Sequence, residues 1–198
     1  YSIADIAGNI SKVEQLILVE DEKDPVSPKA TAEKTNSGEL KLKSAKAGTI
    51  TAIANGNWND PNTWDLGRVP LSDDDVVIAT GFTVTNNTTA SCKSISFQDG
   101  SFLEISTNGN LTCTQNLNLT INPNAKLTIN GGYFKTGASI QNDGLFHLIS
   151  GTVDIGTVAG NELQTRSGAT FRMEGGTLNI SGRLVNSSGE AYISGGSI

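Results

Sequence analysis

The chain has one histidine, two cysteines and one methionine among its 198 residues, and only 6% of its residues are aromatic. Because His147 is the only histidine, no Ser-His-Asp or Cys-His catalytic site can be built without it. His147 alternates with Phe146 and Leu148 in a predicted strand, so an outward-facing strand histidine is the simpler interpretation. No stretch approaches the roughly 18 consecutive apolar residues of a membrane-spanning helix, and no membrane span is predicted.

Positive charge is also scarce. The chain has 14 Lys and Arg against 20 Asp and Glu, which gives a formal net charge of -6. A nucleic-acid-binding protein needs a basic patch or stripe, so no nucleic-acid partner is predicted. No residues stand at a spacing that indicates a cofactor, and none is expected.

The most regular feature of the sequence is a unit of roughly 20 to 25 residues that recurs along its last two thirds. Each copy begins with a turn residue and then alternates apolar with polar side chains, at residues 100–105, 124–129, 144–148, 168–173 and 189–193. A second strand is predicted beyond a glycine corner, at residues 131–134, 151–155, 176–180 and 195–198. A third, more polar strand is predicted at residues 95–97, 117–121, 139–140, 163 and 184–185.

Three short strands per repeat predict an all-β fold, a right-handed parallel β-helix from about Ile50 onward, because crossovers between parallel strands are right-handed. Every second side chain of a strand points inward, so residues such as Leu127, Leu148 and Met173 should stack on their equivalents one coil away. The alternative fold is an antiparallel sandwich, which also has short alternating strands. Repetition at the length of a coil, rather than of a hairpin, favours the β-helix.

Composition divides the chain into three segments. Residues 1–47 hold nearly half of the charged residues in about a quarter of the chain. Within them, residues 25–47 combine Pro25 and Pro28 with mixed charges and no sustained apolar period, which is typical of a flexible linker. A strand, a turn and a second strand are predicted for residues 1–24, and the β-helix is predicted for residues 48–198. A lone hairpin is marginally stable in water, so we expect the native polypeptide to continue beyond both ends of this chain.

The motif D-x-A-G-N at residues 5–9 is followed by a long strand that ends at Glu20 and Asp21, and then by Pro25. This segment resembles the last two strands of a bacterial immunoglobulin-like domain of the hyalin-repeat kind, which occurs in tandem in large surface adhesins. The resemblance implies that residues 1–24 are the C-terminal strands, a β-hairpin remnant, of an immunoglobulin-like sandwich.

Three further motifs follow one another in order, namely W-N-D-P-N-T-W at residues 58–64, G-R-V-P at residues 67–70 and D-D-D-V-V-I at residues 73–78. Together they resemble the opening of the eight-glycine domain, which is known from fibrocystin, from cell-surface hyaluronan-degrading proteins and from secreted proteins of Bacteroidota. In that family the segment begins a right-handed β-helix, in agreement with the periodicity. The repeats after Gly100 are rich in Asn and Thr, closer to bacterial surface proteins than to the animal members. The resemblance implies type IX export and a role in adhesion or gliding.

Two groups of residues in these motifs each fit two roles. Trp58 and Trp64 fit a glycan contact, as an aromatic platform for sugar rings, or a cover over the exposed first coil, which a solenoid needs; the cover is favoured. Asp73, Asp74 and Asp75 fit ligands of Ca²⁺, which takes several oxygens, or a solvated turn before the next strand. The turn is favoured, because no further carboxylates stand at a recognisable spacing.

Cys92 and Cys113 lie one coil length apart, which predicts that they are neighbours in adjacent coils. Paired parallel strands place two Cα atoms within the range of a disulfide, and an exported protein meets oxidising conditions. The alternative is a pair of reduced, buried cysteines that act as small apolar residues.

The sequence offers no obvious catalytic set. Enzymes that cleave polysaccharides bring carboxylates together at one site, whereas the charged residues in neighbouring coils look scattered: Asp154, Arg166, Arg172, Glu174 and Arg183. We therefore expect a non-enzymatic structural or adhesive segment of a large extracellular, cell-surface adhesin. Its expected partners are a surface polysaccharide or another extracellular ligand, and the secretion machinery during export. The alternative is a carbohydrate-active enzyme or a polysaccharide-binding module.

Overall fold

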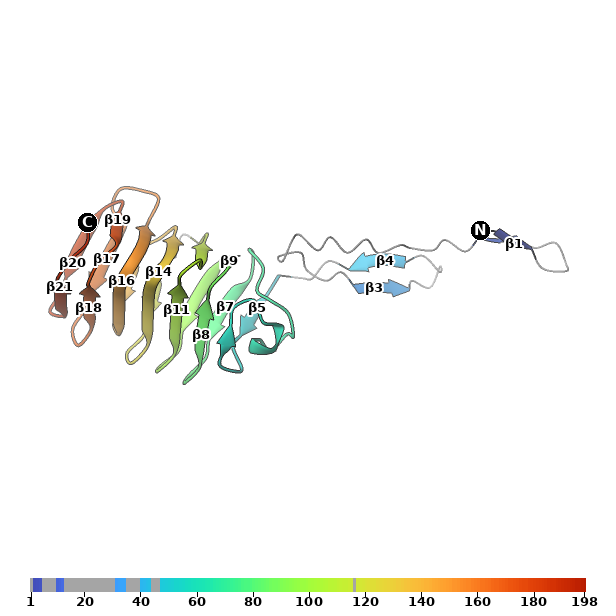
Figure 1. The fold of residues 1–198 in the computed structure, drawn as a ribbon, viewed down its shortest axis with the longest axis horizontal. Helices are drawn as coiled ribbons and strands as arrows, with labels where there is room; N and C mark the ends of the chain where they lie inside the picture. Colours follow the sequence, from blue (N-terminus) through green and yellow to red (C-terminus); the bar gives the residue numbers. More distant parts are fainter. Residues whose placement is uncertain (1, 5–9, 13–30, 35–39, 44–46, 116) are drawn as a thin grey trace.

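The computed structural model describes residues 2–4, 10–12, 31–34, 40–43, 47–115 and 117–198. From Thr49 onward the chain forms a parallel β-solenoid of about 6 turns (Figure 1). Among the described residues the only helical element is the 3₁₀ turn η1 (Pro61–Thr63), and none of them forms a helix suited to crossing a membrane. The predicted all-β parallel β-helix is confirmed, because its strands pair with the equivalent strands of the neighbouring rungs and not with hairpin partners.

The rungs stack their strands into three faces. The first face contains β6 (Gly56–Asn57), β8 (Thr83–Asn86), β11 (Phe102–Ser106), the first half of β14 (Lys126–Thr136), the first half of β16 (Leu145–Ile155), β18 (Thr170–Met173) and β21 (Glu190–Ile193). The second face contains β9 (Thr89–Cys92), β12 (Asn110–Cys113), the second halves of β14 and β16, and β19 (Thr177–Ile180). The third face has two sheets, β5 (Thr49–Thr51), β7 (Asp75–Ile78) and β10 (Ser94–Phe97), then β13 (Leu119–Ile121), β15 (Ile140–Asn142), β17 (Glu162–Thr165) and β20 (Arg183–Asn186).

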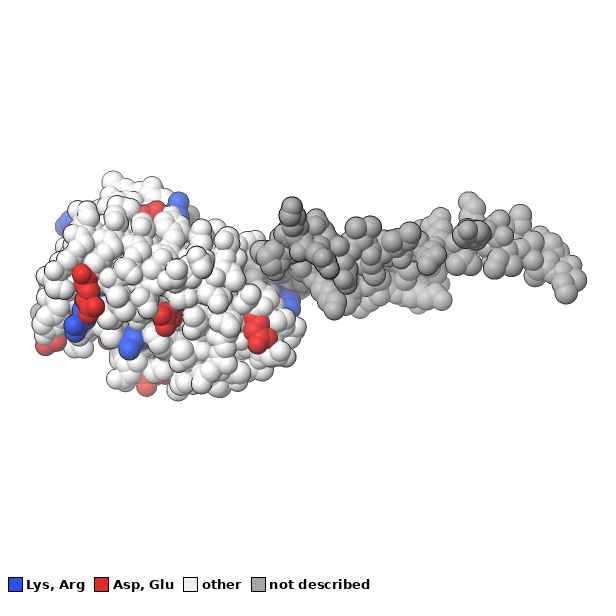
Figure 2. All heavy atoms as spheres, viewed as in Figure 1, with Lys and Arg blue, Asp and Glu red and all other residues white. Residues whose placement is uncertain are grey.

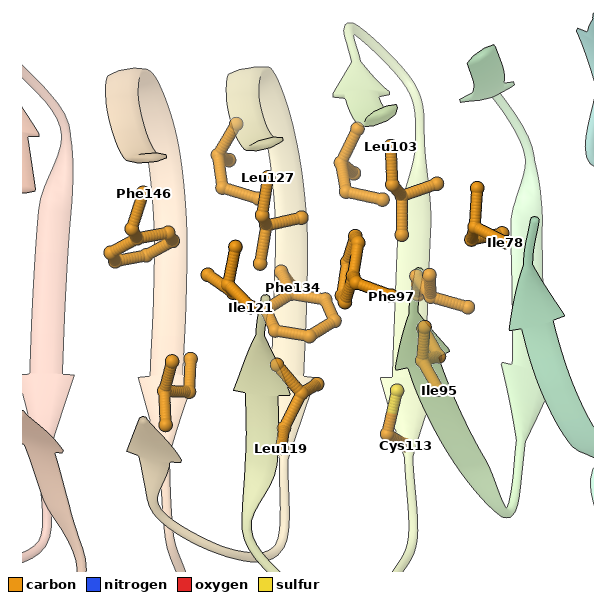
Figure 3. Close-up of a cluster of buried hydrophobic side chains, with 14 of the residues drawn as sticks. Ile78, Ile95, Phe97, Leu103, Cys113, Leu119, Ile121, Leu127, Phe134 and Phe146 are labelled. Atoms are coloured by element: carbon orange, nitrogen blue, oxygen red, sulfur yellow. The ribbon is translucent and has the colours of Figure 1, made fainter. Parts of the chain in front are cut away.

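The interior is a set of side-chain columns that run from rung to rung. One fully buried column passes through Val84, Leu103, Leu127, Phe146 and Phe171, which are register partners on successive strands. Figure 3 shows Leu103, Leu127 and Phe146 projecting from neighbouring strands into this interior. The expected stacking of Leu148 on Met173 is also present. Burial of one such side chain stabilises the fold by about 1.5–3 kcal/mol, and each rung needs its neighbours to obtain that burial.

Glycines turn the chain between the first and second faces. In β14 and β16 the strand runs through this corner without a break, whereas separate strands were predicted there. Gly151 has a φ of +95°, a conformation that residues with a Cβ rarely adopt. A Cβ atom at this position would also lie 2.1 Å from the carbonyl oxygen of Gly132 in the rung below. The corner therefore needs glycine for both its dihedral angles and its close packing.

Ahead of the solenoid, the structure describes two short antiparallel pairs. Strand β1 (Ser2–Ala4) pairs with β2 (Ile10–Lys12), which is the predicted N-terminal hairpin. Strand β3 (Thr31–Lys34) pairs with β4 (Leu40–Lys43), inside the segment predicted to be a flexible linker. The alternation of Leu40 and Leu42 with lysines in β4 suits a strand, and linker composition alone does not reveal this. The D-x-A-G-N motif and residues 13–30 lie outside the described residues, so the immunoglobulin-like assignment stays a prediction.

Candidate functional site

Both tryptophans of the first motif are packed in the core beside the first rung. Trp58 and Trp64 are each 1% exposed, with ring centroids 5.2 Å apart in an edge-to-face arrangement. Trp64 Nε1 donates a hydrogen bond to the carbonyl oxygen of Trp58 at 2.8 Å, and Trp58 borders a small apolar hollow of about 160 Å³ beside Val69 and Pro70. Neither ring presents a face on which a sugar could stack. Their packing fits the favoured role, a cover for the core of the first rung, and not a glycan contact.

The three consecutive aspartates have different surroundings. Asp74 is fully buried, and its carboxylate accepts hydrogen bonds from both Nη atoms of Arg68, at 2.5 and 2.9 Å. The backbone N–H groups of Leu71 and Gly48 donate to the same carboxylate at 2.7 and 2.9 Å. The prediction of a solvated turn is therefore wrong for Asp74. This arrangement, which we call the Arg68–Asp74 clasp, ties the loop before β7 to the start of β5, and it occupies both oxygens of Asp74 with protein donors.

The other two aspartates do not join the clasp. Asp75 accepts from Lys93 Nζ at 2.8 Å and from Ser94 Oγ at 2.6 Å, whereas Asp73 is exposed. Within the described part of the chain, no group of three His, Cys, Asp or Glu side chains is placed to hold a metal ion.

The clasp should make the fold sensitive to acid. Burial on its own raises the pKa of Asp74, but the hydrogen bonds from Arg68, Leu71 and Gly48 outweigh it and hold this pKa below its ordinary value of 3.8. The clasp therefore contributes stability above about pH 4, and this contribution is lost as the pH falls through the folded-state pKa. We expect the difference in unfolding free energy between wild type and Asp74→Asn to shrink as the pH is lowered from about 6 to about 3. Urea titrations at each pH measure it, and a constant difference would contradict the assignment.

Cys92 and Cys113 are neighbours on the second face, as predicted. They are register partners on β9 and β12, both side chains are buried, and their Sγ atoms lie 3.4 Å apart as free thiols. The contact with Cys113, together with burial, raises the pKa of the Cys92 thiol well above its ordinary value of 9.0. The reactive thiolate is therefore disfavoured once the protein has folded.

A disulfide between these cysteines stays a prediction. We expect protein recovered from an oxidising compartment to show no titratable thiol after denaturation without reductant, because exchange with a disulfide oxidant during folding joins the two sulfurs. Reduction should then lower the unfolding free energy by about 3 kcal/mol, the effect of closing a loop of this size. Two titratable thiols in the unreduced, denatured protein would exclude the bond.

The charged side chains of the later rungs do not converge on one site. Figure 2 shows them dispersed over the visible face of the described residues. Most of the charged residues that were named from the sequence form one of three ion pairs: Arg166 with Asp143, Arg172 with Glu174, and Arg183 with Glu162.

The single histidine joins one of these pairs. His147 Nε2 lies 3.2 Å from Glu174 Oε1, and Arg172 Nε donates to the same oxygen at 2.7 Å. The hydrogen bond from Arg172, with a smaller contribution from His147, lowers the pKa of Glu174 below its ordinary value of 4.5. His147 and Arg172 therefore both contact the carboxylate of Glu174. The residues on either side of His147 in β16 are buried.

Asp154, the other acidic residue named from the sequence in the later rungs, lies in a polar groove on the second face. Its carboxylate accepts hydrogen bonds from Tyr133 Oη at 2.5 Å and from Asn179 Nδ2 at 2.8 Å. Lys135, Asp154, Asn179 and Ser181 line this open groove of about 370 Å³. Of these residues only Asp154 could be singled out from the sequence, because the strand register that brings the other side chains beside it is not visible without the fold.

The fold and these clusters define a β-solenoid repeat protein with a structural clasp at its first rung and a polar groove on one face. The chain belongs to the family described as Domain of unknown function (DUF8693), whose model matches residues 49–157, more than half of the chain. No curated protein and no solved structure matches it. The matched residues include both tryptophans, Arg68 and Asp74 of the clasp, and the cysteine pair.

Proposed function

We propose that the chain is a non-enzymatic structural and adhesive segment of a large secreted or cell-surface protein. The observation that carries this proposal is the solenoid itself, whose rungs share one interior and leave outward side chains in straight rows. One such row on the second face passes through Thr89, Asn110, Tyr133, Thr152 and Thr177. A stacked body of this kind presents an extended surface with a regular spacing, which suits a stalk or a binding face.

The finer part of the proposal concerns export and partners. The resemblance of residues 58–78 to the eight-glycine domain, and of residues 1–24 to a hyalin-repeat domain, supports an adhesin or gliding protein that leaves the cell by type IX secretion. Its partners would be the secretion machinery during export and a surface polysaccharide, or another extracellular ligand, afterwards.

Surface labelling and adhesion test this proposal. Antibodies raised against the 198-residue chain should label intact cells of the organism that encodes it, without permeabilisation. Beads coated with the folded chain should attach to these cells or to their extracellular polysaccharide more than beads coated with the heat-unfolded chain. Labelling only after permeabilisation would overturn the location, and equal attachment of both kinds of bead would overturn the adhesive role.

A second candidate function is polysaccharide cleavage. The observation that favours it is the polar groove, where Asp154 and Lys135 line a hollow open to solvent and Tyr133 donates a hydrogen bond to Asp154. A reducing-sugar assay separates the two functions, because an enzyme releases new reducing ends and a binding module retains its ligand unchanged. Product release by wild type that disappears in Asp154→Asn would favour the enzyme.

A further inference from the structure

The groove around Asp154 lies where three rungs present polar side chains in a line. Lys135 on β14, Asp154 on β16 and Asn179 on β19 are register partners, so their backbones are about 4.8 Å apart from strand to strand. Ser181 follows β19 and also lines the hollow, and its Oγ donates to the carbonyl oxygen of Gly156 at 3.0 Å. Because the alternate residues of these strands, such as Val153 and Ile155, fill the core, the polar row faces solvent.

Asp154 is held in a fixed position. Tyr133 Oη and Asn179 Nδ2 each donate to one of its two oxygens. Burial, followed by the contact with Asp154, raises the pKa of Tyr133 to about 12, so the phenol remains a donor at neutral pH. An ionised carboxylate has about four acceptor sites, and two are used here, so Asp154 can accept further hydrogen bonds from a ligand in the groove.

Lys135 supplies the matching donors. Its ammonium group makes no hydrogen bond or ion pair with any side chain in the part of the chain that the structure describes, although three donors are available. The groove therefore combines unused donors on Lys135 with unused acceptor sites on Asp154, one rung apart. The two charges balance, so the site as a whole favours neither an anion nor a cation.

This pattern fits a neutral ligand rich in hydroxyl groups. A sugar hydroxyl donates one hydrogen bond and accepts others, so it can donate to Asp154 while it accepts from Lys135. The carboxylate would repel phosphate, sulfate or uronate groups, and the ammonium would repel metal ions. An extended polysaccharide lying along the solenoid axis would meet an equivalent polar position at each rung.

We propose that the groove formed by Lys135, Asp154, Asn179 and Ser181 binds a neutral, polyhydroxylated polysaccharide that lies along the solenoid axis. This inference rests on the proposed extracellular role and names the ligand class and site through which that role would operate.

Affinity electrophoresis tests the inference. The 198-residue chain is run in native gels that contain laminarin, hydroxyethyl cellulose, dextran or galactomannan as neutral probes, and polygalacturonate or alginate as acidic ones. We expect at least one neutral probe to retard the wild-type chain. Lys135→Ala and Asp154→Asn should each weaken this retardation about tenfold, because each removes a charge-assisted hydrogen bond.

Two variants outside the groove serve as matched controls. Lys126→Ala removes a lysine from the first face, where its ammonium lies 4.9 Å from the ring centre of Phe102. Asp99→Asn changes an aspartate that accepts only from Asn124 in the described structure. Both controls should bind the neutral probe as wild type does, and circular dichroism should show that all four variants are folded.

Three results would overturn the inference: no neutral probe retards the chain, only acidic probes retard it, or the groove variants bind as the controls do. The coated-bead assay separates this failure from failure of the proposed function. If beads carrying Lys135→Ala or Asp154→Asn attach to cells as well as wild type, the adhesive role stands through another surface and the groove assignment alone fails.

Discussion

Replacement of Asp74 by alanine is expected to lower the free energy of unfolding by about 3–5 kcal/mol, the cost of removing one partner from a buried ion pair. The substitution leaves the guanidinium of Arg68 without this carboxylate, and it removes the acceptor for the backbone N–H groups of Gly48 and Leu71. Urea unfolding followed by tryptophan fluorescence measures the loss, because both tryptophans lie beside the first rung that the clasp closes.

The adjacent residue offers a control for this experiment. Asp73 is exposed, so Asp73→Ala should change the unfolding free energy by no more than about 0.5 kcal/mol. The double variant Arg68→Met/Asp74→Leu should lose less stability than Asp74→Ala, because it leaves no charge in the clasp. Equal losses for Asp74→Ala and Asp73→Ala would show that the clasp does not hold the first rung.

The solenoid could be predicted from the sequence because its defining signal is repeated. Alternation within a strand identifies inward residues such as Leu127, and the return of the same pattern one coil later identifies their partners. The same reasoning predicted that Cys92 and Cys113 lie side by side, because it needs only the length of a coil. Errors in any one turn do not affect such a prediction, because each rung supports it independently.

The clusters could not be predicted in the same way, because they depend on loops and on side-chain direction. Arg68 and Asp74 lie in a loop without periodicity, so nothing in the pattern indicates that the arginine folds back onto the aspartate. Trp58 and Trp64 were singled out from their motif, but an aromatic residue in a loop can face either solvent or core, and only the fold shows that both are buried. The partners of Asp154, Tyr133 and Asn179, can be identified only from the strand register across three rungs. The sequence does not show this register, because the positions of insertions between the strands are uncertain.

Among the glycines that the structure describes, Gly151 at the corner between the first and second faces should be the least tolerant of substitution. Gly151→Ala places a Cβ 2.1 Å from the carbonyl oxygen of Gly132, and that oxygen belongs to backbone that cannot move without displacing its own rung. Left-handed backbone at a residue with a Cβ costs roughly 1–2 kcal/mol, and overpacking adds roughly 1–3 kcal/mol. We expect a loss of about 2–5 kcal/mol, measured by urea unfolding followed by far-ultraviolet circular dichroism, which reports on all rungs.

Gly168 separates these two contributions. Its φ is +81°, also in the left-handed region, but a Cβ there would meet no atom within 4 Å. Gly168→Ala should therefore show only the dihedral cost, and the difference between the two variants gives the cost of the contact between rungs. If both variants lose the same stability, then the close packing of the corner is relieved by a small backbone shift. Glycine would in that case be needed at residue 151 for its dihedral angles alone.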